Sequence, residues 1–385
     1  MISQLHIENF RSIEKATFDF GRITLLTGSN NSGKSSVMYA LLTLKCLAEN
    51  PYRPLNNIFN IPDVINMGDF SDVVFGNSFH KSVKFDITLE NEDVKLISGI
   101  AINQFSVLDT NLQILQPFQY SGSLQLSLPC LLSKEIEVID KYRFNGFFII
   151  DPTLRQNHTE WYSKQPLNKF GKTLAFIPTR RGFSKLVFYQ SPFREFQYSE
   201  NEIATEIYAY KLQSDISHYL EKIAERSFEI SKLPDTGILY LKTRDIKTGF
   251  SNNLVNEGTG TNQLVMILAR ALLPESKFIC IDEPEIHLHP SMIEKLVEAL
   301  VEIAYKQDKQ FLLSTHSEHF VTCLLSEVVK KNLQPDDLKV YYLTKEQQTT
   351  KVEHQAVNAD GQIEGGLKNF YESELKNLET FFKIT

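Results

Sequence analysis

One short run of residues limits what this chain can fold into more than any other feature. Residues 28–35 read Gly-Ser-Asn-Asn-Ser-Gly-Lys-Ser, which fits the spacing G-x-x-x-x-G-K-[ST]. An apolar run at residues 23–27 precedes it, and helix-forming residues follow at 36–44. A strand, a glycine-rich loop and a helix in this order point several backbone N–H groups at one anion. The sequence therefore predicts a phosphate-binding loop; an ordinary polar surface loop is the alternative.

Each residue type in this loop has a physical reason to be there. Gly28 and Gly33 allow the tight backbone turn that aims N–H groups inward. Lys34 is expected to neutralise the β- and γ-phosphates of ATP, and Ser35 to place its hydroxyl on Mg²⁺. The residues expected to bind the nucleotide are Gly28, Asn30, Asn31, Ser32, Gly33, Lys34, Ser35 and Ser36.

A second apolar run ends in two acidic residues. Residues 278–283 read Phe-Ile-Cys-Ile-Asp-Glu, typical of a buried strand followed by carboxylates. Beside a phosphate-binding loop, Asp282 is expected to hold Mg²⁺ together with Ser35. Glu283 is then expected to act as the general base for the attacking water. The alternative is an acidic pair that only caps a helix or lies on the surface.

Four histidines lie in two short segments near this acidic pair. His316 follows an apolar run at 311–314, where an imidazole can hydrogen-bond the γ-phosphate and hold the attacking water. A hydrogen-bonded core or loop histidine is the alternative. His287 with His289, and His316 with His319, also have spacings open to metal ligation. No Cys-x-x-Cys pair accompanies them.

The hydrophobic pattern predicts an α/β chain. The segment 278–314 reads strand, helix, strand, which is a βαβ unit and implies a parallel sheet. Residues 46–110 are mostly β in character, and 200–227 form a helix candidate with apolar residues at i, i+4 spacing. The expected strands are at residues 5–10, 16–20, 23–27, 73–75, 82–89, 94–100, 147–150, 278–281, 311–314, 338–343 and 351–357. The expected helices are at 36–44, 200–227, 264–273, 292–304 and from 367 onward.

Composition and charge exclude several classes of protein. Hydrophobic residues make up 42% and charged residues 23%, so the chain is neither disordered nor collagen-like. The net charge of −7 excludes a uniformly basic nucleic-acid coat, although not a local basic groove. The start lacks a signal-peptide pattern and no run suits a membrane helix, so we expect a cytoplasmic protein without membrane contact. Four separated cysteines, expected to be buried fillers, are Cys46, Cys130, Cys280 and Cys323.

Together these segments resemble the ABC-type ATPase heads of the SMC, RecF and OLD lineage. Residues 5–12 look like the I-x-N-F-R-S strand of those heads, and 28–35 and 278–283 look like Walker A and Walker B. His287-Leu-His289-Pro290 is similar to the D-loop, and His316 to the switch histidine. A group of OLD-like AAA ATPases with a short C-terminal tail is the most similar in these motifs.

The family's signature loop is a variant in this chain. Residues 256–263 read Asn-Glu-Gly-Thr-Gly-Thr-Asn-Gln and precede an apolar helix, at the place of the family's LSGGQ. The resemblance implies that Gly258, Gly260 and Thr261 contact nucleotide; the alternative is a plain helix N-terminus. Pro178-Thr-Arg180 resembles a P-L-R segment of the OLD-like group. The 67–75 segment has the expected place of the Q-loop but lacks a glutamine.

The resemblance implies a P-loop NTPase fold: an ABC-type two-lobed ATPase head with a mixed β-sheet core and a helical lobe. The expected parts are an N-terminal ATPase lobe with a β-rich insert at 1–195, a helical lobe with the signature loop at 196–275, and a C-terminal core at 276–385. Two heads would sandwich two ATP molecules, giving a homodimer or a higher even oligomer that opens on hydrolysis.

The biological role implied by the resemblance is a DNA-linked, antiphage ATPase that works with a separate effector, a nuclease or toxin. DNA is a further expected partner. OLD-type nucleases append a TOPRIM domain of on the order of 100 residues, and the chain after His316 is shorter and lacks an Asp-x-Asp pair. An ATP-gated scaffold with little turnover is the second hypothesis, and a transporter ATPase subunit the third.

Two further features stay open at this level. Arg180-Arg181 either binds phosphate, of DNA or of nucleotide across a dimer, or forms a solvated turn before Gly182. The apolar face expected on the helix from residue 367 either packs on the ATPase core or docks the partner.

Overall fold

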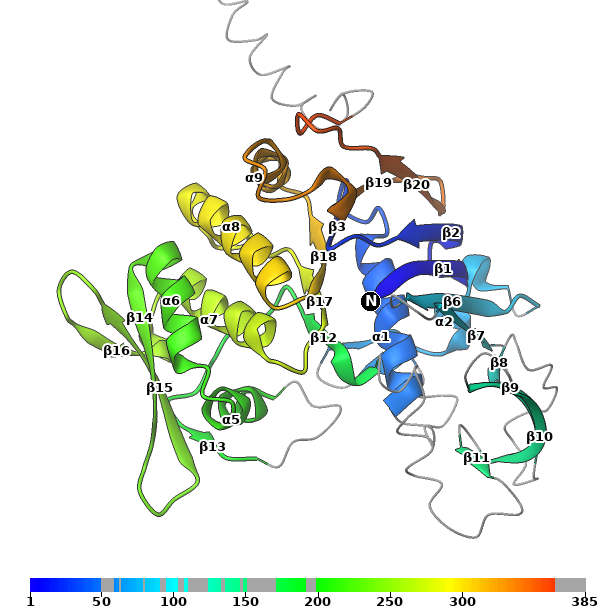
Figure 1. Ribbon diagram of the computed structural model, residues 1–385, viewed down its shortest axis with the longest axis horizontal. Coiled ribbons are helices and arrows are strands. Elements are labelled where there is room, and N and C mark those ends of the chain that lie inside the picture. Colours follow the sequence, from blue (N-terminus) through cyan, green and yellow to red (C-terminus); the bar gives the residue numbers. More distant parts are fainter. Residues whose placement is uncertain are drawn as a thin grey trace, which may run out of the picture.

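A six-stranded sheet forms the centre of the molecule (Figure 1). The computed structural model describes residues 1–49, 59–61, 64–78, 80–90, 95–102, 107–109, 124–132, 136–145, 148–150, 171–191 and 199–363. Across the sheet, the strands are β12 (Leu174–Ile177), β17 (Phe278–Asp282), β18 (Gln310–Thr315), β3 (Ile23–Thr27), β19 (Leu338–Glu346) and β20 (Thr349–Gln355). The first five pair in parallel and β20 is antiparallel, which confirms the predicted mixed sheet.

The core strands are buried on both faces. Ile23 and Leu25 join the hydrophobic cluster packed by helices α5 to α9, whereas Leu26 joins the cluster on the opposite face. Likewise Ile279 belongs to the cluster on the side of helices α5 to α9, and Cys280 to the cluster on the opposite face. Successive side chains of a strand point to opposite faces, so a sheet covered on both sides needs continuous apolar runs. This requirement explains the uninterrupted apolar segments before the glycine-rich loop and before Asp282.

Different layers cover the two faces of the sheet (Figure 1). One face packs on α1 and the N-terminal strands, and the other on the later helices. Short polar or proline caps begin several helices; Ser317, for example, accepts the backbone N–H of Phe320. The helices are α1 (Lys34–Glu49), α5 (Glu200–Ala209), α6 (Gln213–Ala224), α7 (Thr259–Leu272), α8 (Pro290–Lys306) and α9 (Glu318–Val329).

The N-terminal strands form an antiparallel sheet beside α1. The order is β2-β1-β6-β7-β8, and the described register pairs Leu5 with Phe18 and Ile87. Two smaller sheets follow in this part of the chain, β4 with β5, and β9 to β11. The strands of all three sheets are β1 (Ile2–Phe10), β2 (Ile13–Asp19), β4 (Asn60–Ile61), β5 (Ile65–Asn66), β6 (Val83–Glu90), β7 (Lys95–Ile102), β8 (Val107–Asp109), β9 (Leu124–Leu132), β10 (Ile136–Asn145) and β11 (Phe148–Ile150).

The predicted strand at residues 73–75 is wrong. The structure has a helical turn there, α2 (Phe70–Val73), followed by the 3₁₀ turn η2 (Phe75–Asn77). The Asp69 backbone N–H donates to the Asp72 carboxylate at 2.8 Å, which stabilises the start of α2. Gly76 follows in a left-handed conformation with φ of 65°, which a regular strand excludes.

The single helix predicted over 200–227 is also wrong in its bounds. The chain breaks between α5 and α6, where Lys211 has a φ of 55°, and it becomes a strand at Arg226. Its apolar spacing continues across the break because both helices bury residues in one cluster. The region also contains a sheet that the sequence pattern did not indicate: β13 (Phe188–Tyr189), β14 (Arg226–Lys232), β15 (Ile238–Asp245) and β16 (Ser251–Asn253).

The C-terminal predictions divide into two groups. The strands expected at 338–343 and 351–357 correspond to β19 and β20, after the 3₁₀ turn η4 (Pro335–Asp337). The helix expected from residue 367 lies outside the described residues. Among the helices of the described part, none combines the length and the apolar character needed to span a bilayer.

Candidate active site

Three segments that are far apart in the sequence meet at one edge of the core sheet. Strands β3, β17 and β18 are parallel neighbours, so their carboxyl ends share an edge. Register pairs Asp282 with Ser314, and Thr315 with Thr27, directly before the loop at 28–35. The loop, the acidic pair and the His316 segment therefore lie together, as the βαβ pattern indicated.

Lys34 is held inside the glycine-rich loop. Its Nζ donates to the carbonyl oxygens of Gly28 at 2.8 Å and Ser29 at 2.9 Å. Burial lowers the pKa of this ammonium, while the nearby carboxylates of Glu283 and Asp282 act in the opposite direction. Only 7% of the residue is exposed, so its charge is directed at the loop rather than at bulk water.

The two outer glycines are required by both conformation and space. Gly28 and Gly33 have φ of 133° and 109°, values that disfavour any side chain. A Cβ on Gly28 would lie 2.0 Å from the carbonyl oxygen of Leu343, and one on Gly33 would lie 2.4 Å from the hydroxyl of Thr350. The loop is thus packed against β19 and β20 from the C-terminal part of the chain.

Thr350 braces this loop. Its hydroxyl donates to the carbonyl oxygen of Ser32 at 2.8 Å and lies 2.8 Å from the Ser12 hydroxyl. The Thr350 backbone N–H donates to the carbonyl oxygen of Ser12 at 2.7 Å. The Ser32 hydroxyl is buried and has no hydrogen-bond partner among the described residues. It is a polar atom of the loop that remains free to bond an oxygen of a ligand.

A cavity of about 760 Å³ opens over the loop. It is large enough for a nucleotide, and its wall carries both charge signs. Lys34, Asp282 and Glu283 all contribute to it. The lining residues are Arg11, Ser12, Asn30, Asn31, Ser32, Gly33, Lys34, Ser35, Ser36, Asp72, Val74, Gly76, Asn77, Thr179, Asp282, Glu283, Lys345 and Gln348.

Asp282 is oriented by two hydroxyl groups. Thr179 Oγ1 donates to its Oδ2 at 2.9 Å, and Ser314 Oγ donates to Oδ1. A carboxylate has about four acceptor positions, so both oxygens keep further lone pairs. Ser35 and Asp282 line the same cavity with hard oxygen donors, the ligands that Mg²⁺ prefers. These residues fit the expected cation.

Glu283 occupies an unusual backbone conformation. Its φ is 50°, a left-handed value rare for residues with a side chain. The backbone N–H donates to the carbonyl oxygen of Ser314 at 3.0 Å. Its Oε1 lies 3.0 Å from Nδ1 of His316, which is itself not a lining residue of the cavity. Glutamate and histidine therefore form a pair at the cavity edge.

Glu285 is a buried carboxylate that the sequence pattern did not single out. Thr315 Oγ1 donates to its Oε1, whereas Oε2 is buried with no partner within the described parts of the chain. Burial raises the pKa of this carboxyl, and the hydrogen bond from Thr315 opposes that shift.

The two adjacent arginines have different surroundings. Arg180 is exposed, whereas Arg181 turns inward. Arg181 Nη1 donates to the carbonyl oxygens of Pro178 and Asp282 at 3.1 and 2.7 Å, and Nη2 to that of Glu283 at 2.7 Å. A solvated turn is therefore wrong for Arg181, and its guanidinium is already engaged within the chain.

The signature-like residues lie away from the cavity of their own chain. Gly258, Gly260 and Thr261 are not among its lining residues. A Cβ added to Gly258 would meet no heavy atom of the described residues within 4 Å, and this glycine is the uncapped N-cap of α7. Gly260 packs on the D-loop-like segment, where a Cβ would lie 2.6 Å from the carbonyl oxygen of His287.

Three of the four histidines open to metal ligation, His289, His316 and His319, have other contacts. His289 caps α8 by accepting the Ser291 backbone N–H, and His319 Nε2 lies 3.2 Å from the carbonyl oxygen of Pro290. In the described part of the chain, no three His, Cys, Asp or Glu side chains gather as a metal site requires. Cys46, Cys280 and Cys323 are buried free thiols, while the Cys130 side chain lies outside the described ones.

Sequence reasoning missed several residues of the cavity wall. Lys345 and Gln348 arrive from the β19–β20 hairpin, and Thr179 from the end of β12. Two resemblances were the available signals: Asp72 lies inside the 67–75 segment at the expected place of the Q-loop, and Thr179 lies inside the P-L-R-like segment. No sequence spacing marks Asn77, Lys345 or Gln348, because only the folded sheet brings them to the loop.

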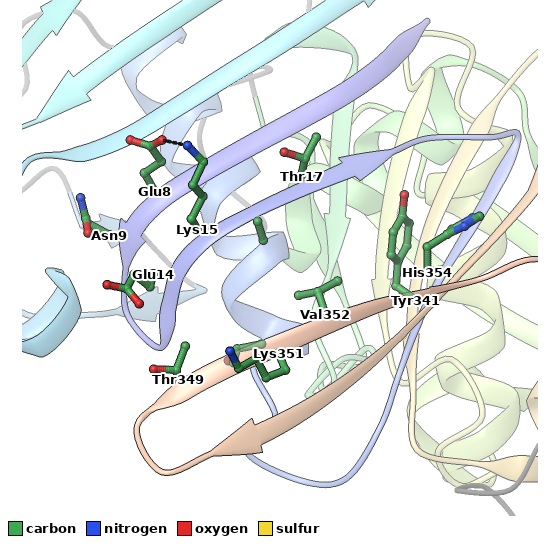
Figure 2. A pocket seen from close by; sticks show the side chains of 12 residues that line it. Glu8, Asn9, Glu14, Lys15, Thr17, Tyr341, Thr349, Lys351, Val352 and His354 are labelled. Carbon is green, nitrogen blue, oxygen red and sulfur yellow. Dashed lines mark ion pairs between the residues drawn. The ribbon is translucent and has the colours of Figure 1, made fainter.

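A second cavity, of about 590 Å³, lies between the β1–β2 hairpin and β20 (Figure 2). In its wall Lys15 Nζ lies 2.9 Å from the Glu8 carboxylate, and Lys84, which does not line the cavity, has its Nζ 3.4 Å from the same carboxylate. Hydrogen bonds from Lys15 and His6 lower the pKa of Glu8 to about 2. None of the predicted nucleotide residues lines this cavity, and the charge of Glu8 is balanced within the chain.

The fold and the cavity define a P-loop ATPase with an SMC- and ABC-like head. The chain belongs to the family described as "AAA domain, putative AbiEii toxin, Type IV TA system", whose family model matches residues 23–322. It is therefore an ATPase, as the loop and the acidic pair indicated. The finer resemblance to short-tailed OLD-like ATPases stays a prediction.

Known proteins similar to this chain agree with that class. A relative from Helicobacter pylori (strain ATCC 700392 / 26695), named "ATP/GTP phosphatase", is 22% identical over 363 residues, covering 90% of this chain and 94% of that protein. An SMC head bound to the C-winged helix domain of ScpA has a TM-score of 0.55 at 13% identity, covering 93% and 98% of the two chains. A Pyrococcus furiosus SMC head with an extended coiled coil, bound to the C-terminal domain of ScpA, has a TM-score of 0.54 at 13% sequence identity, covering 99% of each chain. These structures support the fold.

Proposed function

We propose that this ATPase works as an ATP-gated dimer of heads, in which the signature-like residues of one copy complete the nucleotide site of the other. One observation carries the proposal. The N-terminal turn of α7, with Gly258 and Thr261, is accessible and lies outside the cavity of its own chain. An uncapped helix N-terminus attracts phosphate, so a second head can supply the nucleotide that this turn meets.

Within each site the residues divide the work. The loop N–H groups and Lys34 hold the β- and γ-phosphates, while Ser35 and Asp282 would hold Mg²⁺, which would supply charge neutralisation for the reaction. Glu283 accepts a proton from the attacking water as the oxygen forms its bond to the γ-phosphorus and the bond to the β-phosphate oxygen breaks. His316, beside Glu283, holds that water and the γ-phosphate. ADP and inorganic phosphate leave, and the heads separate.

The role of the dimer is to control a separate effector, a nuclease or another toxic protein, in a DNA-linked defence system. The family description names a putative toxin of a toxin–antitoxin system, which supports a defence setting and a partner protein but assigns the toxin name to the family itself. Both SMC head structures contain a bound second protein, and that association belongs to those heads. A homodimer or higher even oligomer, with DNA as a further partner, follows from the same proposal.

Trans-complementation tests the dimer directly. Lys34→Ala removes the phosphate-binding cation but keeps the signature turn, whereas Gly258→Asp places a carboxylate at that turn but keeps Lys34. Each variant alone should lose ATP turnover. Their mixture should regain part of the wild-type rate, because a mixed dimer contains one intact composite site. A mixture as inactive as its components, while wild type hydrolyses ATP, would contradict the composite site.

A variant that binds ATP without hydrolysing it should stay in the ATP-bound dimer, and the mass of that state gives a second test. Glu283→Gln should bind ATP, lose turnover by about 10² to 10⁴-fold, and double in mass by light scattering when Mg-ATP is added. Lys34→Ala is the matched control and should keep one mass with and without ATP. An unchanged mass of Glu283→Gln, at concentrations where ATP is bound, would argue against nucleotide-driven association.

The effector is tested by separation. Purified chain is incubated with plasmid DNA, ATP and Mg²⁺ or Mn²⁺, and no cleavage is expected without a partner. Cleavage that persists through purification and disappears in Glu283→Gln would show that the chain carries its own nuclease, contrary to the proposal.

A further inference from the structure

A short segment at residues 178–183 connects the acidic pair to the signature helix; we refer to it as the strap. It leaves β12, whose last residue, Ile177, pairs with Ile281 of β17. Pro178 and Asp282 therefore start side by side at the edge of the sheet. The other end of the strap is hydrogen-bonded to α7, so the strap contacts the acidic pair at one end and the signature helix at the other.

At its first end, the strap holds the backbone of both acidic residues. One Arg181 guanidinium donates to the consecutive carbonyl oxygens of Asp282 and Glu283, each at 2.7 Å. Its planar fork fixes the direction of both peptide groups, which a lysine cannot do. Thr179 adds a hydrogen bond to the Asp282 carboxylate at 2.9 Å. The contacts thus reach the main chain and the side chain of the acidic pair.

The conformation of Glu283 depends on such support. A φ of 50° is strained for a residue with a side chain, and surrounding bonds must hold it there. The N–H side is bound by Ser314 on β18, and the C=O side by Arg181. Without the Arg181 contact, this peptide is free to rotate toward negative φ, and the carboxylate moves with it.

At its second end, the strap is fixed to the first turns of α7. The Asn262 side chain accepts the Phe183 N–H at 2.7 Å and donates to the Phe183 carbonyl oxygen at 2.9 Å. The Gly182 N–H lies 3.3 Å from the sulfur of Met266. Asn262 follows directly after Thr261, so a shift of the signature turn reaches Phe183, two residues from Arg181.

Burial makes the Arg181 contact costly to rearrange. Desolvation lowers the pKa of the guanidinium to about 10, so it stays charged near neutral pH. Its Nε is buried with no partner among the described residues, and three of its other four N–H groups are committed to carbonyl oxygens. The nearby carboxylates of Glu285, Asp282 and Glu283 also favour this charge, and the bonded carbonyls satisfy its N–H groups, so moving the guanidinium away would leave buried donors without partners.

We infer that Arg181 is a positioning residue for Glu283, and that the strap makes the position of this base respond to the signature turn of α7. The inference rests on the proposed function, in which Glu283 activates water and the turn meets the nucleotide of a second head. Closure of the dimer shifts the turn, the Asn262 amide carries that shift to Phe183, and Arg181 sets the Glu283 peptide for hydrolysis.

Substitution of the arginine tests the first part. Arg181→Gln should lower kcat by about a hundredfold, because a small misplacement of a base is costly, and Arg181→Lys should fall between it and wild type. The Kd for a non-hydrolysable ATP analogue should stay within about twofold, because the loop is untouched. Arg180→Gln, at the exposed neighbour, is the matched control and should keep wild-type kcat. A kcat of Arg181→Gln equal to wild type would overturn the inference.

Chemical rescue separates positioning from folding. Adding guanidinium ion to Arg181→Ala should restore part of kcat without changing the analogue Kd, whereas sodium at equal ionic strength should not. If Arg181→Ala does not fold, the same kcat-to-Kd split is read in Arg181→Lys. The folded fraction of each variant is measured alongside kcat. If each folded molecule turns over at the wild-type rate, the loss of kcat reflects misfolding, and the positioning role is overturned.

The Asn262 end tests the coupling. Asn262→Ala should lower the kcat of the dimer while leaving the analogue Kd of the loop unchanged, and combining it with Arg181→Gln should add little, because both act on one path. Fully additive losses would overturn the coupling. Wild type without ATP turnover would instead refute the proposed function, so the two failures are distinct.

Discussion

Two helices in this molecule begin with glycine-bearing turns, and the two turns differ in how they are completed. Before α1, Gly28 and Gly33 have positive φ and are packed against Leu343 and Thr350. Before α7, Gly258 has a φ of −57° and open space around it. The first turn is finished by its own chain, whereas the second is presented to the outside. Similar sequence composition thus serves an internal site in one case and an accessible surface in the other.

The largest expected effect sharpens this comparison at the first turn. Lys34→Ala should weaken ATP binding by about a hundredfold or more, because it removes a mostly buried cation aimed at the phosphates. Isothermal titration with Mg-ATP measures the loss. Lys351→Ala, an exposed lysine on β20, is the control and should keep the wild-type Kd. Equal affinity in Lys34→Ala and wild type would remove the loop as the nucleotide site.

The next effect separates the two glycines by stability. Gly28→Ala should lower the free energy of unfolding by about 3 kcal/mol or more, because the methyl group meets the Leu343 carbonyl and the φ is strained. Gly258→Ala should cost less than about 1 kcal/mol, because only an N-cap preference is lost. Urea denaturation gives both values. Equal losses at the two positions would break the comparison.

A smaller effect is expected from the brace on the loop. Thr350→Val keeps the shape of the side chain but removes the hydroxyl that donates to Ser32, leaving that buried carbonyl without this donor. The expected loss is about 1 to 2 kcal/mol in unfolding free energy, together with weaker ATP binding. Thr349→Val, next to it on β20, serves as the control. Unchanged stability and unchanged ATP affinity in Thr350→Val would show that the loop does not need the brace.

The smallest effect concerns Glu285, which lies between the acidic pair and the segment that Gly260 touches. Burial raises the pKa of Glu285 above its ordinary value of 4.5, so the folded state favours the protonated form. Wild-type stability should therefore lose this contribution as pH rises from about 4.5 through the raised pKa. Glu285→Gln lacks this titration and should gain stability relative to wild type over that range. The midpoints of urea unfolding of wild type and Glu285→Gln are compared across this pH range. A difference between them that stays constant with pH would contradict the prediction.

The first turn was predictable from the sequence, and most of what surrounds the second was not. The strand, loop and helix around residues 28–35 are local, because glycine, lysine and an apolar run follow one another in the chain. The acidic pair after β17 was found in the same way. The inward turn of Arg181 was not predictable, since its partners, the carbonyls of Asp282 and Glu283, are about a hundred residues away.

The errors in secondary structure have equally specific causes. Apolar spacing continued across Lys211 because both helices share one core, so periodicity alone concealed the break between α5 and α6. The strands β14 and β15 bury one face only, and their many charged residues weakened the strand pattern. At 70–77, an aspartate pair and a left-handed glycine outweighed the β-branched residues.

The position of β3 in the sheet has a consequence for the order of events during synthesis. This strand is synthesised well before both of its neighbours, β18 and β19, which lie about 300 residues further along the chain. The loop after β3 also lacks the hydrogen bond from Thr350 to Ser32 until residue 350 has been made. At ordinary elongation rates, on the order of tens of seconds separate the two ends. A nascent chain therefore carries its phosphate loop unfinished until β19 and β20 have been made, and we expect ATP binding to begin only after that point.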